Sequence, residues 1–93
     1  MSLEGLVDKY IASAEQALKE LQRTEGVLTV GEDDVKKVLG YVVAYLEDAK
    51  YYKGQKRCDT SLTSVAYCEG LLDALKLLGA VKFEWPRNMK NAK

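Results

Sequence analysis

Three carboxylates are the first candidates for a catalytic or metal-binding site. Asp48, Glu69 and Asp73 could act as general acids and bases or as metal ligands if the fold gathered them together. We expect Asp48 on one helix and the other two on the next, antiparallel helix, which spreads the carboxylates by up to about 15 Å. We therefore interpret them as polar contacts at helix seams, with these expected partners: Ser61 or Ser64 for Asp48, and Lys36 or Lys37 for Asp73.

The types of residue that are missing restrict the chemistry further. The chain has no histidine, which removes the commonest general base and the commonest protein metal ligand. Its cysteines, Cys58 and Cys68, are ten positions apart, so on one helix their Cα atoms would be about 15 Å apart, beyond the ~7 Å limit of a disulfide. We expect reduced thiols, no metal, no cofactor and no catalytic activity.

A basic cluster with neighbouring tyrosines is the second candidate site. Basic side chains beside aromatic rings can hold phosphates and stack bases, so the cluster could bind nucleic acid or a nucleotide phosphate. Lysines also favour the C-terminal turn of a helix, where they complement the helix dipole, and we prefer this interpretation. The cluster consists of Lys50, Tyr51, Lys53, Lys56 and Arg57.

Composition excludes several broad classes of protein. The 93 residues suit a single domain, and 47% hydrophobic with 30% charged residues is typical of a folded globular chain. Fourteen basic and fourteen acidic residues give no net charge, which argues against a protein that coats DNA. No segment approaches the roughly 20 apolar residues needed to cross a bilayer. We expect a cytoplasmic protein without membrane contacts.

The positions of the apolar residues predict the elements that carry these side chains. Apolar residues recur at spacings of three and four, which predicts helices at about 3–23, 33–53 and 59–78, with Gly54 as a left-handed stop after the second. Short connections favour antiparallel neighbours, so the expected fold is all-α: an up-down-up three-helix bundle with a short extended C-terminal tail. Residues 1–86 would form this single domain, followed by a basic tail at 87–93 that we expect to be disordered.

Some aromatic and apolar side chains cannot all belong to the core of so small a bundle. Six tyrosines exceed the seam positions available, and the third helix is apolar almost all round. We therefore predict a protein-interaction or scaffolding role, with another protein or a second copy of this chain as the partner and nucleic acid as the alternative. The candidate interaction residues are Tyr41, Tyr51, Leu71 and Trp85.

Two short signatures connect the sequence to a known family. Asp48-Ala49, followed by the run from Glu69 to Ala74, resembles the archaeal family known as domain of unknown function 357. The resemblance implies a short, cytosolic, helical archaeal protein, and the family brings no established catalytic residues. We expect the signature residues to be structural: Asp48, Ala49, Glu69, Gly70, Asp73 and Ala74.

Overall fold

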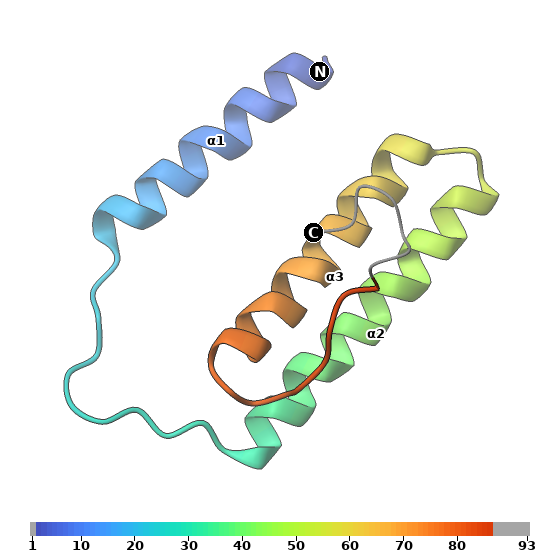
Figure 1. Ribbon diagram of the computed structural model, residues 1–93. Coiled ribbons are helices and arrows are strands. Elements are labelled where there is room, and N and C mark those ends of the chain that lie inside the picture. The colour runs from blue at the N-terminus through green and yellow to red at the C-terminus, as the bar shows by residue number, and fades with distance from the viewer. Residues whose placement is uncertain (1, 87–93) are drawn as a thin grey trace.

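The computed structural model describes residues 2–86, and every regular element within them is a helix. The helices are α1 (Leu3–Glu20), α2 (Glu32–Gly54) and α3 (Cys58–Leu77) (Figure 1). The predicted all-α, three-helix class is confirmed. Helix α1 ends earlier than predicted, at Glu20, because its apolar pattern stops at Leu21 and polar residues follow.

The ends of the helices follow from local sequence. Ser2 caps α1, since its Oγ accepts a hydrogen bond from the backbone N–H of Gly5 at 2.9 Å. Helix α3 ends in a Schellman motif, in which Gly79 has a φ of +79° and the N–H of Ala80 donates to the carbonyl of Leu75. The predicted left-handed stop at Gly54 is wrong: Gly54 is helical, and Lys56 takes the left-handed conformation with a φ of 61°.

Helices α2 and α3 form an antiparallel hairpin whose seam is the core of the protein. The buried side chains along this seam alternate between the two helices: Val42, Ala49, Cys68 and Leu75. A polar bond also crosses it, because Ser61 Oγ donates to the carbonyl oxygen of Ala49 at 2.7 Å. The rings of Tyr45 and Tyr67 stack across the same seam, with centroids 4.4 Å apart. Close packing therefore links α2 and α3 along their length.

The C-terminal segment after α3 turns back and runs along one side of the hairpin (Figure 1). Its anchor is Trp85, whose Nε1 donates to Asp73 Oδ1 at 2.9 Å. The ring of Phe83 contacts the indole edge-on, and the ammonium group of Lys76 lies 4.9 Å from the centroid of that ring. The segment is extended, as predicted. The predicted disordered tail at 87–93 lies outside the described residues.

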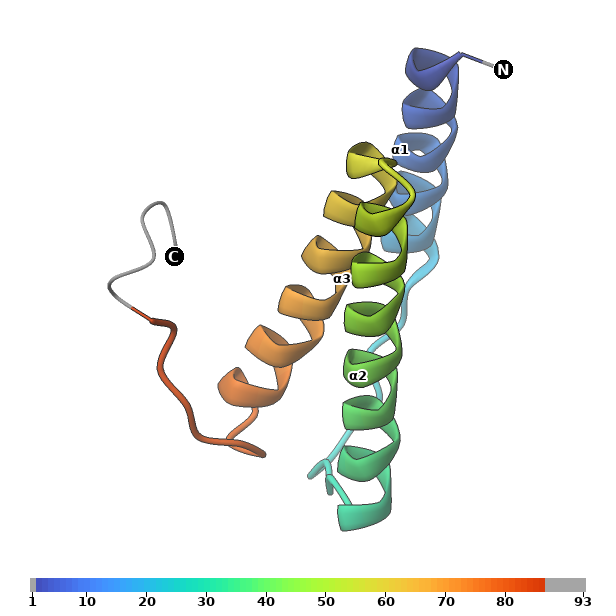
Figure 2. The ribbon, with the colours of Figure 1, turned by 90° about the vertical axis from the view of Figure 1, so that its right-hand side faces the viewer.

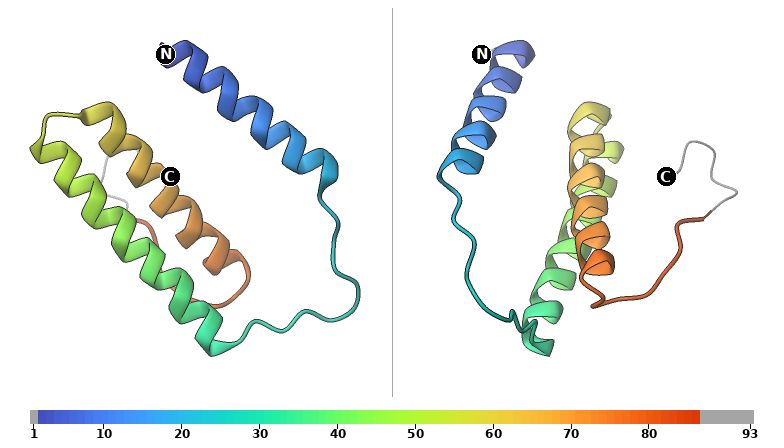
Figure 3. Two further views of the ribbon diagram at one scale, coloured as in Figure 1. Left: turned by 180° about the vertical axis from the view of Figure 1, so that it is seen from behind. Right: turned by 60° about the vertical axis from the view of Figure 1, so that its left-hand side comes forward.

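Helix α1 stands apart from the hairpin. It runs antiparallel to α2, which gives the predicted up-down-up order (Figures 1 and 3). Between residues 2 and 86, however, α2 and α3 are the only helices whose Cα atoms approach within 8 Å of each other. The radius of gyration is 16.0 Å, whereas a compact chain of this length has about 12 Å. The bundle packing thus extends over two of the three helices.

The seam makes a direct prediction about stability. Leu75 is 4% exposed in the seam, whereas Leu77 in the same helix is 89% exposed. We expect Leu75→Ala to lower the free energy of unfolding by about 2–4 kcal/mol, because it leaves a cavity between α2 and α3. The matched control, Leu77→Ala, should change it by less than about 0.5 kcal/mol. Chemical denaturation followed by circular dichroism measures both values, and equal losses would contradict the assigned seam.

Candidate interaction surface

One side of α1 carries a continuous row of large apolar side chains in contact with solvent. Their spacing of three and four residues places them on one face of the helix, and their exposed fractions run from 37% at Leu6 to 71% at Leu18. We call this row the α1 stripe: Leu3, Leu6, Val7, Tyr10, Ile11, Ala14 and Leu18. The opposite face of α1 is polar. A helix with such a pattern normally buries its apolar side against another element.

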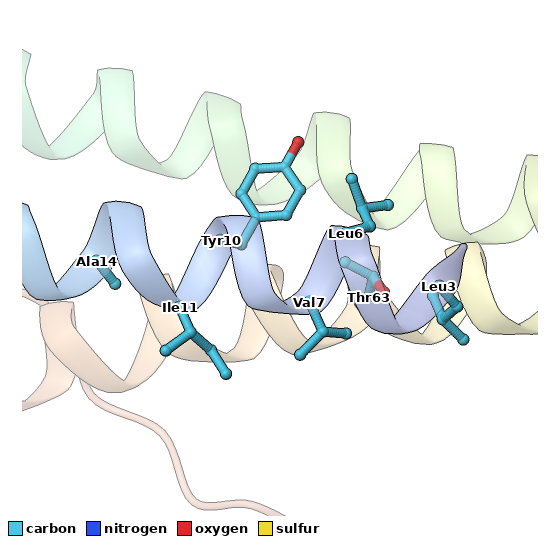
Figure 4. A pocket seen from close by; sticks show the side chains of 7 residues that line it. All are labelled: Leu3, Leu6, Val7, Tyr10, Ile11, Ala14 and Thr63. Atoms are coloured by element: carbon cyan, nitrogen blue, oxygen red, sulfur yellow. The ribbon is translucent and has the colours of Figure 1, made fainter. Parts of the chain in front are cut away.

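A cavity of about 490 Å³ opens between the α1 stripe and α3 (Figure 4). Six stripe residues, from Leu3 to Ala14, line it together with Thr63 of α3. A second cavity of about 350 Å³ continues toward the hairpin turn, where Leu3 and Leu6 lie near Arg57 and Asp59. The first cavity is bounded almost wholly by carbon atoms. It therefore suits apolar side chains rather than a charged ligand.

The side of the hairpin away from the C-terminal segment forms the complementary surface. In Figure 3 α1 and the C-terminal segment lie on opposite sides of the α2–α3 pair. Thr63 of α3 lines the cavity beside α1, and helical periodicity places Tyr67, whose ring stacks on that of Tyr45, on the same side of α3. The same periodicity places the neighbouring side chains around this stack. We call this surface the open face: Lys37, Tyr41, Tyr45 and Asp48 of α2, with Thr63, Tyr67, Gly70 and Ala74 of α3.

The predicted interaction residues are divided between different surfaces. Tyr41 is exposed on the open face. Tyr51 is also exposed, but it lies on the outer side of α2, where its ring contacts that of Tyr52. Leu71 and Trp85 are half-buried, and Trp85 is engaged with Asp73. The three-helix bundle predicted from the sequence would bury the α1 stripe, but periodicity shows only that a face is apolar and not what covers it.

The signature residues serve the hairpin rather than a common site. Ala49 is buried and Asp73 holds the indole of Trp85, so the seam and the C-terminal segment each use one of them. Glu69 is half-buried, while Asp48, Gly70 and Ala74 are exposed. Of the two hydroxyls predicted as partners of Asp48, Ser61 or Ser64, that of Ser61 donates to the backbone of Ala49 instead. Among residues 2–86 no cluster of acidic or cysteine side chains is suited to a metal ion.

The basic cluster lies at the turn end of the hairpin, and two of its four cations interact within the chain. Lys50 forms an exposed ion pair with Glu47 at 3.3 Å. The guanidinium of Arg57 lies 5.0 Å from the centroid of the Tyr52 ring and donates to Thr60 Oγ1. Lys53 and Lys56 are exposed at the turn. These contacts are those of a solvated helix end, which is the interpretation we prefer.

The two thiols occupy contrasting environments. Cys58 is exposed at the start of α3, whereas Cys68 is buried in the seam, and neither forms a disulfide. Burial raises the pKa of the Cys68 thiol, and the neighbouring carboxylate of Glu69 raises it further. Cys68 is therefore held as a neutral thiol, which is poorly nucleophilic.

No helix in the described part of the chain combines the length and the apolar character needed to cross a bilayer. The family model for DUF357, described as a protein of unknown function, matches residues 9–81. The match includes α2, α3 and more than half of α1, and the chain belongs to this family. Searches of curated proteins and of solved structures found no match.

The environments of the thiols predict different reactivities. In the folded protein we expect an aromatic disulfide reagent to modify Cys58 at least about a hundred times faster than Cys68, because Cys68 is both buried and neutral. The variants Cys58→Ser and Cys68→Ser assign the two kinetic phases. Denaturant should make the rates converge. Equal rates in the folded protein would contradict the burial of Cys68.

The raised pKa of Cys68 also predicts how stability depends on pH. The folded state holds the thiol proton more tightly than the unfolded chain, whose thiol pKa is about 8.5. The favourable contribution of the Cys68 thiol proton to the free energy of unfolding is thus complete below about pH 8.5. It is lost as the pH rises through the higher pKa of the folded state. Cys68→Ala should show a smaller loss of unfolding free energy between about pH 8 and pH 10 than the native chain or Cys58→Ala.

Proposed function

We propose that this protein is a helical interaction module without catalytic activity, and that the α1 stripe is the surface through which it binds a partner. The observation that carries the proposal is the exposure of the stripe: large apolar side chains at helical spacing, beside a cavity lined by the same residues. Large contiguous apolar surfaces on soluble proteins mark interaction sites. The proposal thus rests on a surface that the chain leaves uncovered.

The expected mode of binding is an amphipathic helix in an apolar groove. The anchors Leu3, Val7, Tyr10 and Ala14 recur at spacings of four and three, which is the pattern such a groove recognises. Complete burial of one large apolar side chain contributes about 1.5–3 kcal/mol. Docking would also stabilise α1 itself, because most of the stability of a helix in a protein comes from the packing of its apolar face.

The site contains little that would support catalysis. The carboxylates Asp48, Glu69 and Asp73 occupy different positions around the hairpin, and Asp73 is engaged by Trp85. The cavity of about 490 Å³ is apolar and lies beside α1 rather than beside these carboxylates. We further propose that the module works in the cytoplasm of an archaeal cell. Support comes from the family resemblance and from two thiols that remain unpaired.

The test compares two pairs of substitutions on opposite faces of α1. Val7→Glu with Ile11→Glu places two charges in the stripe, four residues apart and ahead of Glu15. Ala12→Glu with Gln16→Glu places two charges on the polar face, four residues apart and ahead of Glu20. Both variants add two acidic side chains, four residues apart and four residues ahead of a native glutamate.

Immobilised native protein and both variants are incubated with extract of the source cells, and bound protein and nucleic acid are quantified at low and high salt. We expect the native chain and the polar-face variant to retain a protein at a fixed ratio in high salt. The stripe variant should retain at least about tenfold less, because a buried charge without a partner is costly. Equal retention by both variants would refute the proposal. Nucleic acid released by salt, with no retained protein, would favour the basic cluster instead.

A further inference from the structure

We propose that the partner of the α1 stripe is a second copy of this chain, whose hairpin receives α1 on its open face. This inference rests on the proposed function and identifies the partner of the same surface. Two copies would exchange their α1 helices, so that each hairpin is completed by the α1 of the other chain. Three kinds of observation lead to this arrangement: the charges that flank the two surfaces, the sizes of their side chains, and the apolar area left uncovered.

The charges beside the α1 stripe match those beside the open face when α1 lies antiparallel to α2. Lys9 and Glu20 are eleven residues apart on one flank of the stripe, and Lys37 and Asp48 are eleven residues apart on the flank of α2. Eleven residues make about three helical turns, so each pair lies on one side of its helix. A register that places Lys9 opposite Asp48 therefore also places Glu20 opposite Lys37. Both contacts join opposite charges.

The observed position of α1 has the same direction and a similar register. Helix α1 runs antiparallel to α2 (Figure 1), and its first turn lies near the hairpin turn, where Leu3 lines a cavity with Arg57 and Thr60. In the register defined by the charges, Leu3 would lie opposite Gly54, at the end of α2. The structure thus orients α1 lengthwise along the hairpin (Figure 2), nearest to α3, but leaves it separated from the hairpin (Figure 1).

The sizes of the side chains are complementary as well. On α3 the open face carries the small uncharged residues Gly70 and Ala74, and Ala66 lies beside them; all three are exposed. In the same register the large side chains of Ile11 and Leu18 lie on the flank of α1 that would meet α3. Small residues allow a second helix to approach closely, and large residues fill the space between the backbones. The α1 stripe therefore fits the surface that α3 leaves uncovered.

The connector between α1 and α2 is long enough for α1 to reach the hairpin of another copy. Residues 21–31 have no helix and can span up to about 36–40 Å, whereas connections within bundles usually need about 2–8 residues. Exchange of an identical element between two copies of a chain is a low-cost route to a dimer.

The solvent-exposed area of the chain is large enough to supply the interface of a permanent dimer. The chain exposes 8360 Å², whereas a compact monomer of 10.4 kDa exposes about 5,400 Å². The excess of about 3,000 Å² per chain, or about 6,000 Å² for two chains, is larger than the total of about 2,000–5,000 Å² that obligate dimers typically bury, counted over both partners. An exchanged pair could remove much of this surface from water.

The experiment reverses the charges on one surface at a time in the full chain. One variant combines Lys9→Glu with Glu20→Lys on α1, and the other combines Lys37→Glu with Asp48→Lys on the hairpin. Neither variant changes the net charge, and each places like charges opposite one another in all four contacts of an exchanged dimer. When the two variants are mixed, a heterodimer restores opposite charges in every contact. Closure of α1 within one chain gains nothing from mixing.

Sedimentation velocity at about 50 mM salt, over roughly 1–100 µM protein, measures the fraction of dimer, because exposed charge pairs are least screened at low salt. We expect the native chain to sediment as a dimer. Each variant alone should dimerise about tenfold more weakly, and an equimolar mixture should recover most of the native dimer. A native chain that stays monomeric, variants that dimerise normally, or a mixture that gives no recovery would each overturn the exchange.

A separate outcome distinguishes failure of this inference from failure of the proposed function. A monomeric native chain whose α1 amides are protected from hydrogen exchange would show that α1 closes on its own hairpin. A retained protein of different sequence, lost only in the stripe variant, would keep the interaction module and replace the second copy as its partner. If the stripe and polar-face variants behave alike both in capture from the extract and in sedimentation, the proposed function fails as well.

Discussion

The seam between α2 and α3 is the interaction on which the rest of the structure depends. Apolar side chains from both helices, with Ala49 and Leu75 the most deeply buried, fix their antiparallel alignment, and the Ser61 hydroxyl satisfies a carbonyl there. That alignment places Asp73 where it can hold Trp85, so the C-terminal segment covers one side of the hairpin. It leaves the other side, with its stacked tyrosines, open. A small seam thus determines both the covered and the uncovered surfaces.

The small size of this core explains why α1 matters for function. A chain of under a hundred residues buries little apolar surface in any case, and here one helix of three contributes none of its large side chains to the core. An unpacked amphipathic helix is weakly stable and exposes surface that favours association. The free energy of docking α1 would therefore combine apolar burial with the ordering of the helix, which makes its folding sensitive to the presence of a partner.

Much of the hairpin could be predicted from the sequence, because local rules determine it. The three-and-four spacing of apolar residues identified the helices, and the alternation around Trp85 identified an extended returning segment. The partners of Asp73 and Ser61 could not be predicted, since both depend on how distant segments are aligned. The same limit applies to α1. Its sequence shows that one face must be buried, but the pattern is identical whether that face meets its own hairpin, a second copy or another protein.

The most direct test of the account is hydrogen exchange of the full chain, measured by mass spectrometry at low and high protein concentration. The account predicts that amides of α1 become protected as the concentration rises, whereas α2 and α3 keep the same protection throughout, because the hairpin forms within one chain and α1 packs only on another. Strong protection of α1 at a concentration where the chain sediments as a monomer would contradict the central claim.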